Sequence, residues 1–416
     1  MSDGTTKGPG MPSIPNQAPQ ADDLPWFISV DDHVVEPPTV WSDRLPAKYR
    51  DVGPRYARRR IGLTRWQQGA FVTDKDDNGV ETDVWLFEDV VKPIRRNIAA
   101  AGLDRDEMDL NPISFDEMRK GCFDATARLA DMDLNHVGAS LCFPQMSRFC
   151  GQEFSEAKDK DLGLACIKAY NDWMVDEWCA TDRARLIPLI MVPLWDGELA
   201  AAEVRRNAER GVRAVTFSEN PYVLGFPSIH SGAWEPFFRA CAETDTTINM
   251  HIGSSSKMAT VSPDAVPAVG ASLSSANAVS SLMEFLFSGV LERYPTLLLA
   301  YSEGQVGWIP YQLERADAVW SEHRAWNGLK GEMKRPPSHY YYRQVYGCVF
   351  RDFFGMRNLA DVGEDNVTFE VDYPHTDSTF PNTVALAREM FAGLSDEQRY
   401  KVCRGNAIRM LHLDQD

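Results

Sequence analysis

Eight short runs of apolar and β-branched residues recur along this chain of 416 residues. Most of the runs are continuously hydrophobic, which is typical of parallel strands that are buried on both faces. Amphipathic segments of helical length separate most of them. The runs span residues 26–30, 139–143, 186–192, 212–217, 246–250, 297–301, 344–349 and 367–371. This alternation predicts an α/β fold of the (β/α)8 TIM-barrel type, which needs about 250 residues.

The remaining residues fall into an N-terminal arm and one long insertion. Residues 1–24 are rich in Pro, Gly and polar side chains, so we expect a flexible arm ahead of a single domain over residues 25–416. More than a hundred residues separate His33 from Ala139, far more than a crossover helix needs. We expect residues 38–115 of this insertion to cap the barrel mouth. Within it, residues 70–87 are predicted to form a β-hairpin that turns at Asn78-Gly79.

The composition excludes several classes of protein. The 43 Lys and Arg residues face 60 Asp and Glu residues, and the resulting net charge of −17 repels nucleic acid and anionic membranes. No stretch approaches the roughly 18 apolar residues of a membrane span, and the N-terminus lacks a signal-peptide pattern. The eight cysteines include no CxxC pair, which favours reduced core thiols over disulfides or a zinc cluster. We therefore expect a cytoplasmic protein that binds neither nucleic acid nor membrane.

Polar side chains directly follow several of the predicted strands. In a parallel barrel the active site lies at the carboxyl ends of the strands, so these residues are the candidates for chemistry. The first strand is followed by Asp31 and His33, which period-two alternation places on one side. The later strand ends carry Glu219, His251, Glu303 and Asp372, with His375 three residues after the last of these.

Taken singly, each of these residues has an ordinary structural explanation, such as a helix cap or a buried hydrogen bond. Five potential metal ligands at one rim are harder to explain in that way: Asp31, His33, His251, Glu303 and Asp372. Three carboxylates packed together without a cation would repel one another and shift their pKa values, and a divalent metal removes that cost. The sequence therefore predicts a metal site at the barrel mouth.

Longer motifs resemble those of the amidohydrolase-2 branch of the amidohydrolase superfamily. They are DxH at 31–33 with EP at 36–37, FPQMSRFCGQEF from 143, YNDW at 170–173, PSIHSGAWEP at 227–236, HIGSS at 251–255, SEGQVGWIPYQLER at 302–315, VDYPHTD at 371–377 and GNAIRML at 405–411. The resemblance implies a TIM barrel with a metal held by Asp31, His33, His251 and Asp372. The chain departs from the commonest pattern in three places: the first pair is Asp-x-His, Glu303 stands where His is usual, and no Lys ends the fourth strand.

These departures make the expected ligand set harder and more anionic. Mixed carboxylate and imidazole ligands suit iron or manganese, whereas imidazole-rich tetrahedral sites suit Zn²⁺. The pattern is similar to the Asp-x-His group that includes the TIM-barrel non-heme di-iron monooxygenase of platensimycin and platencin biosynthesis. That similarity implies an O2-dependent oxidoreductase of antibiotic biosynthesis with two iron ions. It would hydroxylate a hydrophobic, terpenoid-like, CoA-linked acyl substrate with electrons from a donor that the sequence does not identify.

Under this hypothesis the residues have separate roles. Asp31, His33, His251, Glu303 and Asp372 bind metal, His230 or Glu219 completes a second metal site, and His375 relays protons or bonds to bound oxygen. A cap or supporting role for His230 and His375 is equally open, and we expect Glu36 to support His33 from behind. The alternative hypothesis is a hydrolase or non-oxidative decarboxylase with one Zn or Mn ion, in which no redox step occurs.

Two further groups bear on the substrate and on assembly. We expect about a third of eight aromatic residues near the predicted rim to line an apolar pocket, namely Trp85, Phe87, Phe149, Trp173, Tyr222, Phe226, Trp234 and Trp308. The basic cluster of Arg55, Arg58, Arg59 and Arg60 could meet CoA phosphates, although a solvated loop is the more common explanation. Barrels of this type are commonly homo-oligomers, and we expect the same here.

Overall fold

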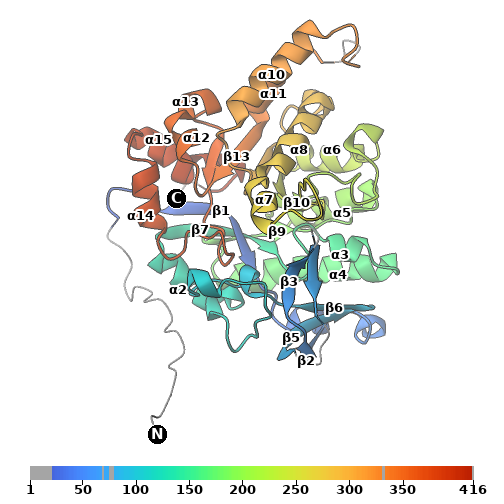
Figure 1. The fold of residues 1–416 in the computed structure, drawn as a ribbon. Coiled ribbons are helices and arrows are strands. Elements are labelled where there is room, and N and C mark those ends of the chain that lie inside the picture. The colour runs from blue at the N-terminus through green and yellow to red at the C-terminus, as the bar shows by residue number, and fades with distance from the viewer. Residues whose placement is uncertain (1–20, 68–69, 75–78, 330–332, 415–416) are drawn as a thin grey trace.

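Eight parallel strands close into a barrel in the computed structural model, which describes residues 21–67, 70–74, 79–329 and 333–414 (Figure 1). The strand order is β8-β7-β1-β14-β13-β12-β11-β10-β9. The two ends of this order meet, because β8 (Leu186–Ile187) and β9 (Leu189–Ile190) are consecutive halves of one strand. Pro188 separates the halves, since it has no N–H to donate to the ladder. The predicted (β/α)8 TIM barrel is confirmed.

The other barrel strands lie on the predicted apolar runs to within a few residues. They are β1 (Phe27–Val34), β7 (Val137–Pro144), β10 (Ala214–Phe217), β11 (Thr247–His251), β12 (Leu299–Ser302), β13 (Val345–Val349) and β14 (Val367–Phe369). Nearly every residue of these strands is buried, as expected for parallel strands covered on both faces.

A register shift in β1 decides which polar residues reach the barrel mouth. Ile28 and Val30 pack in an inner apolar cluster with residues such as Leu141. If side chains alternated strictly along β1, Asp32 would point to the same side of the strand as Ile28 and Val30, and Asp31 and His33 would point to the opposite side. The pairing of β1 with β7 shifts register between Ser29 and Asp32, and such irregularities re-aim side chains near active sites.

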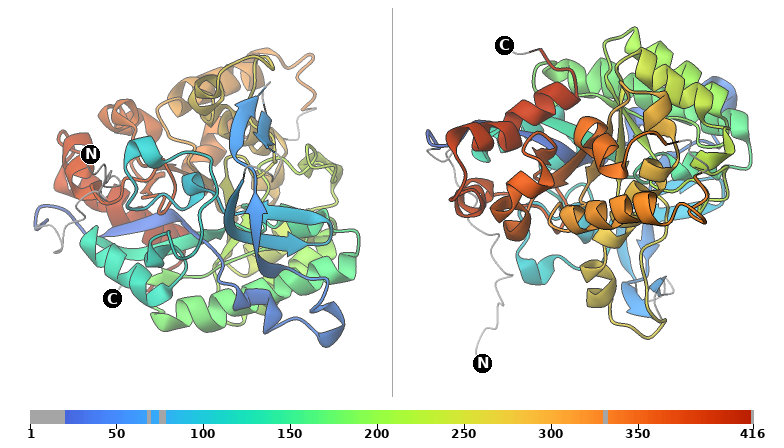
Figure 2. Two further views of the ribbon diagram at one scale, coloured as in Figure 1. Left: turned by 60° about the horizontal axis from the view of Figure 1, so that its bottom comes forward. Right: turned by 90° about the horizontal axis from the view of Figure 1, so that it is seen from above.

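Helices surround the strands in the view from above (right panel of Figure 2). The predicted helices correspond to α4 (Lys160–Trp173), α5 (Gly197–Ala208), α6 (Glu235–Glu243), α8 (Ser275–Phe287) and α10 (Ile309–Glu322). Beyond Trp173 the chain continues as a π-helix (Met174–Trp178) and a 3-10 turn (Cys179–Thr181). Helix α2 (Ala125–Leu134) precedes β7.

The C-terminal segment is helical and consists of three pieces. They are α15 (Asp396–Tyr400), a π-helical turn (Lys401–Gly405) and α16 (Asn406–Met410). A capping box begins α15, because the Ser395 side chain accepts from the Gln398 backbone and the Gln398 side chain accepts from the Ser395 backbone.

The insertion contains hairpins, but not the predicted one. Strand β5 (Val80–Phe87) pairs with β2 (Arg55–Ile61) and β6 (Val90–Pro93), whereas β4 (Ala70–Thr73) pairs with β3 (Thr64–Gln67). The predicted pairing of 70–73 with 80–87 is therefore wrong, because side-chain alternation marks a strand without identifying its partner. Asn78 of the predicted turn lies outside the described residues. The blue strands of the insertion lie toward the viewer in the left panel of Figure 2.

The described chain begins inside the segment predicted to be an arm. Residues 1–20 of that segment lie outside the described residues, while Ala21 and Leu24 are buried and Asp23 pairs with Arg388 at 2.6 Å. All eight cysteines are buried and free, as expected for reduced core thiols. Within the described ranges, no helix is both long and apolar enough to cross a membrane.

Candidate metal centre

The carboxyl ends of four barrel strands bring together a compact group of ionisable side chains. One potential ligand atom from each of His33, His251, Glu303 and His375 lies within 4.8 Å of the others. Asp31 and Asp372 border this group, since their Oδ1 atoms each lie 3.4 Å from His33 Nε2. Five of these six residues are buried, and only the Glu303 side chain retains slight exposure. Side chains from β1, β11, β12 and β14 therefore converge as predicted.

No described residue donates a hydrogen bond to the carboxylate oxygens of Asp31 or Asp372. Both side-chain oxygens of Asp31 and both of Asp372 are buried and have no hydrogen-bond partner among the described residues. Burial raises the pKa of each carboxyl, and the charges of nearby Glu370 and Glu303 raise it further. Buried polar atoms are nearly always satisfied. Unpartnered oxygens that face imidazole nitrogens therefore fit a bound divalent cation, which would satisfy the oxygens and offset the repulsion.

The tautomer of His251 fits the same cation. His251 Nδ1 lies 2.6 Å from the Ile252 carbonyl oxygen, so Nδ1 carries the hydrogen and donates it. The lone pair of Nε2 then faces Asp31 Oδ2 at 3.5 Å and Glu303 Oε1 at 3.6 Å. His33 Nε2 is only 3.2 Å from His251 Nε2. Burial lowers the pKa of both rings, which keeps them neutral and able to bind metal.

Glu303 and Asp372 occupy strained backbone positions. Their φ angles are +56° and +58°, in the left-handed region that non-glycine residues rarely adopt. The Glu303 N–H donates to Glu370 Oε2 at 3.1 Å, and the Asp372 N–H donates to the Asp31 carbonyl at 2.8 Å. Strain held in place by neighbouring bonds is typical of functional sites. Although burial raises the pKa of Glu303, interactions with the neighbouring His251 and His375 rings lower it overall.

His375 lies inside the group rather than behind it. Its ring stacks on His33 with the centroids 3.6 Å apart. His375 Nδ1 is 3.0 Å from Asp372 Oδ1, without the alignment of a hydrogen bond, and 3.6 Å from Glu303 Oε1. Its Nε2 contacts the Gln145 side-chain amide. Gln145 thereby fixes the orientation of the ring.

The structure does not bring Glu219 or His230 to this group. Glu219 Oε1 accepts from the Gly253 N–H at 3.0 Å and from Ser255 Oγ at 2.7 Å, so it holds the loop that follows His251. His230 lies in a half-exposed 3-10 turn (Ile229–Ser231), 3.7 Å from Glu284. Its turn comes a dozen residues after β10, too far along the chain for the strand end to place it.

Glu36 differs from its expected role beside His33. Its buried carboxylate accepts from the backbone N–H groups of Gln145 and Met146 at 2.9 and 2.8 Å, and burial raises its pKa to about 7. His33 is instead held by the fully buried Arg128 on α2, whose guanidinium donates to the His33 and Gly121 carbonyls.

Sequence reasoning missed Glu370, Gln145 and Arg128. Glu370 is fully buried beneath Asp31 and Asp372, and burial raises its pKa to about 8. Period-two alternation in the segment 370–372 could have placed Glu370 on the same side as Asp372. Gln145 belongs to the motif FPQMSRFCGQEF, which could have drawn attention to it. The sequence does not mark Arg128 as a site residue, because an arginine on a helix is ordinarily exposed to solvent.

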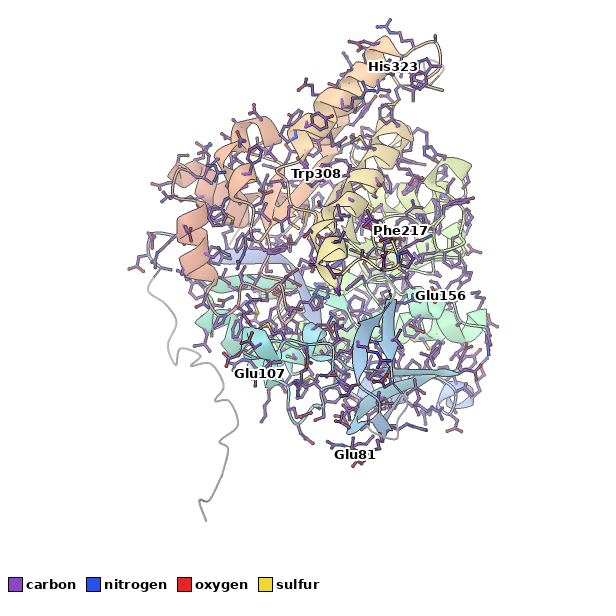
Figure 3. All side chains as sticks on the ribbon, viewed as in Figure 1. Glu81, Glu107, Glu156, Phe217, Trp308 and His323 are labelled. Atoms are coloured by element: carbon purple, nitrogen blue, oxygen red, sulfur yellow. The ribbon has the colours of Figure 1, made fainter. Side chains whose placement is uncertain are left out.

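A cavity of about 190 Å³ is lined by Gln145 and Phe149, which contact the group, and Phe149 is one of the eight aromatic candidates. Phe149 stacks on His251 with the ring centroids 3.9 Å apart. Four of the others are buried in the core, namely Trp85, Phe87, Trp173 and Trp234. Phe226 and Trp308 pack against the core, whereas Tyr222 is 69% exposed. Trp308 lies at the start of α10 in Figure 3.

The four arginines proposed to meet CoA phosphates all lie on β2 of the insertion. Their side chains are exposed, and Arg58 is bonded to Asp116 at 3.0 Å. None of them lines the cavity beside the ligand group.

Comparison with known proteins identifies related folds. The amidohydrolase family model matches residues 84–413. The fold is similar to an amidohydrolase from Mycobacterium avium subsp. paratuberculosis K-10, with a TM-score of 0.67 and 18% identity over 93% of this chain and 99% of that one. It is also similar to a 5-carboxyvanillate decarboxylase from Novosphingobium aromaticivorans DSM 12444, complexed with manganese and 4-hydroxy-3-methoxy-5-nitrobenzoic acid. That comparison has a TM-score of 0.56 and 21% sequence identity, and it covers 71% of this chain and 82% of the other. A third similar fold is that of a 2,6-dihydroxybenzoate decarboxylase from Rhizobium, with a TM-score of 0.58 and 15% sequence identity over 94% of this chain and 100% of the other.

The prediction of an O2-dependent monooxygenase, and with it the oxidoreductase class, is wrong. The similar folds belong to decarboxylases and amidohydrolases, and one of these structures holds manganese. Nothing in these similarities supports a resemblance to a platensimycin-type enzyme, a pair of irons or a role in antibiotic biosynthesis. The geometry also gives no support to a second metal site, because the two residues expected to complete it, Glu219 and His230, lie outside the ligand group.

Proposed function

Because the chain belongs to the amidohydrolase family, we propose that it is a metal-dependent, non-oxidative decarboxylase of a small aromatic acid. The four unpartnered, buried oxygens of Asp31 and Asp372 carry this proposal. Three of them, both oxygens of Asp31 and Oδ1 of Asp372, lie 3.4 to 3.5 Å from the Nε2 atoms of His33 and His251, an arrangement that a single divalent cation would fit.

The proposed metal is one Mn²⁺ or Zn²⁺ ion, held by Asp31, His33, His251 and Asp372. Two imidazoles with two carboxylates suit either ion, and carboxylate-rich sites favour Mn²⁺. When bound, the metal would polarise the substrate and orient its oxygen atoms as a Lewis acid. This proposal agrees with the manganese held by the similar 5-carboxyvanillate decarboxylase.

The chain's own residues would handle the proton. In decarboxylation the bond between carbon and carboxylate breaks, its electron pair stays on the ring carbon, CO2 leaves and the carbon takes a proton. His375 is the proposed proton donor, because its Nδ1 faces Asp372 and Glu303 while Gln145 contacts Nε2. Phe149 and the buried Phe143 would exclude water, since both rings pack against His251.

Metal analysis and an anaerobic assay test the proposal. We expect one Mn or Zn per chain, and CO2 release from hydroxylated benzoates without oxygen uptake. In D2O the product should gain one deuterium at the carbon that lost CO2. Asp372→Asn should lose both metal and activity.

The outcomes that contradict this proposal are specific. Incorporation of ¹⁸O from labelled water without CO2 release would indicate a hydrolase instead. Oxygen consumption coupled to turnover, or a chain that binds no metal, would overturn the assignment altogether.

A further inference from the structure

Another cavity lies at the end of the barrel opposite the ligand group. Its volume is about 470 Å³, within the range of about 300 to 1,000 Å³ that is typical of small-molecule sites. The residues that line it stand where strands begin: Ile28 is the second residue of β1, Gly138 is the second of β7, and Arg213 directly precedes β10. The candidate metal ligands stand at the carboxyl ends of the strands, so this cavity is separate from the proposed active site.

Much of the wall of this cavity is apolar. Ile28, Ala139 and Ile187 line it and belong to the cluster of buried side chains inside the barrel. Ile408 and Leu411 of the C-terminal segment line it too and belong to the same cluster. Covering such a surface with an apolar group removes it from water, which favours binding. A ligand that suits this cavity therefore has an apolar part.

The charged residues of the same cavity are mainly cationic. Arg183, Arg213 and Arg404 line it, and Asp414 supplies the one carboxylate among its described lining residues. None of the three arginines forms an ion pair with a described residue. This is unusual for a chain in which 60 acidic residues outnumber 43 basic ones. We call this cavity, lined by Arg183, Arg213 and Arg404, the arginine cavity.

Arg213 and Arg404 differ in what else they do. Arg213 Nη1 donates to the Ala208 and Val212 carbonyls at 3.0 and 2.9 Å, so this arginine also caps the end of α5. Arg404 is half-buried, and no described residue accepts a hydrogen bond from it. Its guanidinium therefore has no structural partner and is available to a ligand.

A further guanidinium lies close to that of Arg404. Arg185 Nε donates to the Gly138 carbonyl at 2.9 Å, and a Cβ atom added to Gly138 would lie 3.4 Å from Arg404 Nη1. Both guanidinium groups therefore approach Gly138. Arg185 is balanced by Asp133 at 2.8 Å, whereas Arg404 has no such counter-charge. A bound anion would supply the missing counter-charge and the missing acceptor.

We propose that the arginine cavity binds an organic phosphate, with the phosphate on the arginines and a ring of the ligand against the apolar wall. This site does not depend on the proposed function. Guanidinium groups bind phosphate oxygens through paired hydrogen bonds. Three arginines against one aspartate leave a net charge of two. A phosphate monoester, with a charge of about −1.5 to −2 at pH 7, matches that excess better than a single carboxylate does.

Calorimetric titration with 1-naphthyl phosphate, 1-naphthol and inorganic phosphate tests this proposal. Naphthol lacks the charge and inorganic phosphate lacks the ring, so we expect 1-naphthyl phosphate to bind at least about tenfold more tightly than either. Arg404→Met should weaken its binding about ten- to a hundredfold, as for a charge-assisted hydrogen bond. Asp414→Asn should tighten it, because a repelling carboxylate is removed. Arg59→Met is the matched control, since Arg59 is an exposed arginine that does not line the cavity.

The same titrations distinguish this cavity from the two other places where a phosphate would bind. We expect unchanged affinity in manganese-loaded and EDTA-treated protein, and in Lys92→Met, which alters the cavity of about 190 Å³ beside the ligand group. Affinity that disappears with the metal or with Lys92 would overturn the proposal. Equal affinities of the wild type and Arg404→Met would also overturn it. If Arg404→Met melts below the wild type, Arg183→Met decides instead, because the Arg183 side chain is exposed.

Discussion

At the scale of single residues, Asp372 shows how strongly the site depends on a cation. Asp372→Asn removes the charge but keeps the shape, and Asn also tolerates the left-handed φ of +58°. We expect manganese affinity to fall more than about a hundredfold. The metal-free variant should melt at a higher temperature than the metal-free wild type, because fewer carboxylates repel one another. Calorimetric titration with MnCl2 and melts in EDTA measure both effects, and unchanged affinity would contradict the assignment.

Glu370 links stability to pH in the metal-free protein. Burial raises its pKa from 4.5 to about 8, so the folded state keeps a proton that the unfolded chain has released. The free energy of unfolding therefore falls as pH rises through this interval. The buried histidines act in the opposite direction near pH 6.5, because the unfolded chain still protonates about half of them. The contribution of Glu370 is therefore read from the difference between the wild type and a variant that lacks its carboxyl group.

Urea unfolding in EDTA at pH 6.5 and pH 8 measures this dependence. We expect Glu370→Gln to lose less stability than the wild type between the two values. The change that remains in the variant combines a loss from Glu36, whose pKa burial raises to about 7, with a gain from His33 and His251, whose pKa values burial lowers. Identical losses in the two proteins would show that Glu370 does not carry the proton.

At the scale of elements, the segment after β7 depends on Glu36. Glu36→Ala leaves the buried N–H groups of Gln145 and Met146 without their acceptor. The cost should be about 3 kcal/mol of unfolding free energy. Because Gln145 contacts His375, manganese affinity should also fall about tenfold or more. Glu36→Gln, which retains an acceptor oxygen, is the control, and equal effects of the two changes would argue against this bonding.

The strands and helices were predictable because each buries a continuous apolar pattern. Strand β11, for example, combines a buried run with the polar His251 at its end. The partners in the insertion were not predictable, because β4 and β5 carry the same alternation whichever strand they pair with. The break at Pro188 inside the third strand follows from a missing backbone donor and could have been foreseen.

The site was predictable only where a strand end fixes the position of a residue. Asp31, His251 and Asp372 come directly at or after their strands, and the structure brings them together. His230 lies in a separate turn, so proximity in a motif did not imply proximity in space. Arg128 supports His33 from 95 residues away in the chain, a contact that depends on tertiary packing alone.

At the scale of the whole molecule, metal should raise stability through mass action. At a hundred times its dissociation constant, a ligand that binds only the folded state adds about 2.7 kcal/mol. For 416 residues the unfolding entropy is about 0.9 kcal/mol per kelvin, so we expect Tm to rise by about 3 °C. Scanning calorimetry with and without MnCl2 measures this shift. Asp372→Asn is the control that should show no shift, and a wild-type Tm indifferent to manganese would contradict a resident metal.

The ligand group and the nearby cavity wall come from two different parts of the chain, the barrel strands and the insertion. The ligand group stands on barrel strands, whereas Lys92 and Arg95 come from the insertion between β1 and β7. Substitutions on the inserted segment can therefore change the wall of this cavity while the strand ends that carry the ligand group stay the same. Such an arrangement would let selection, or a protein engineer, vary the two independently.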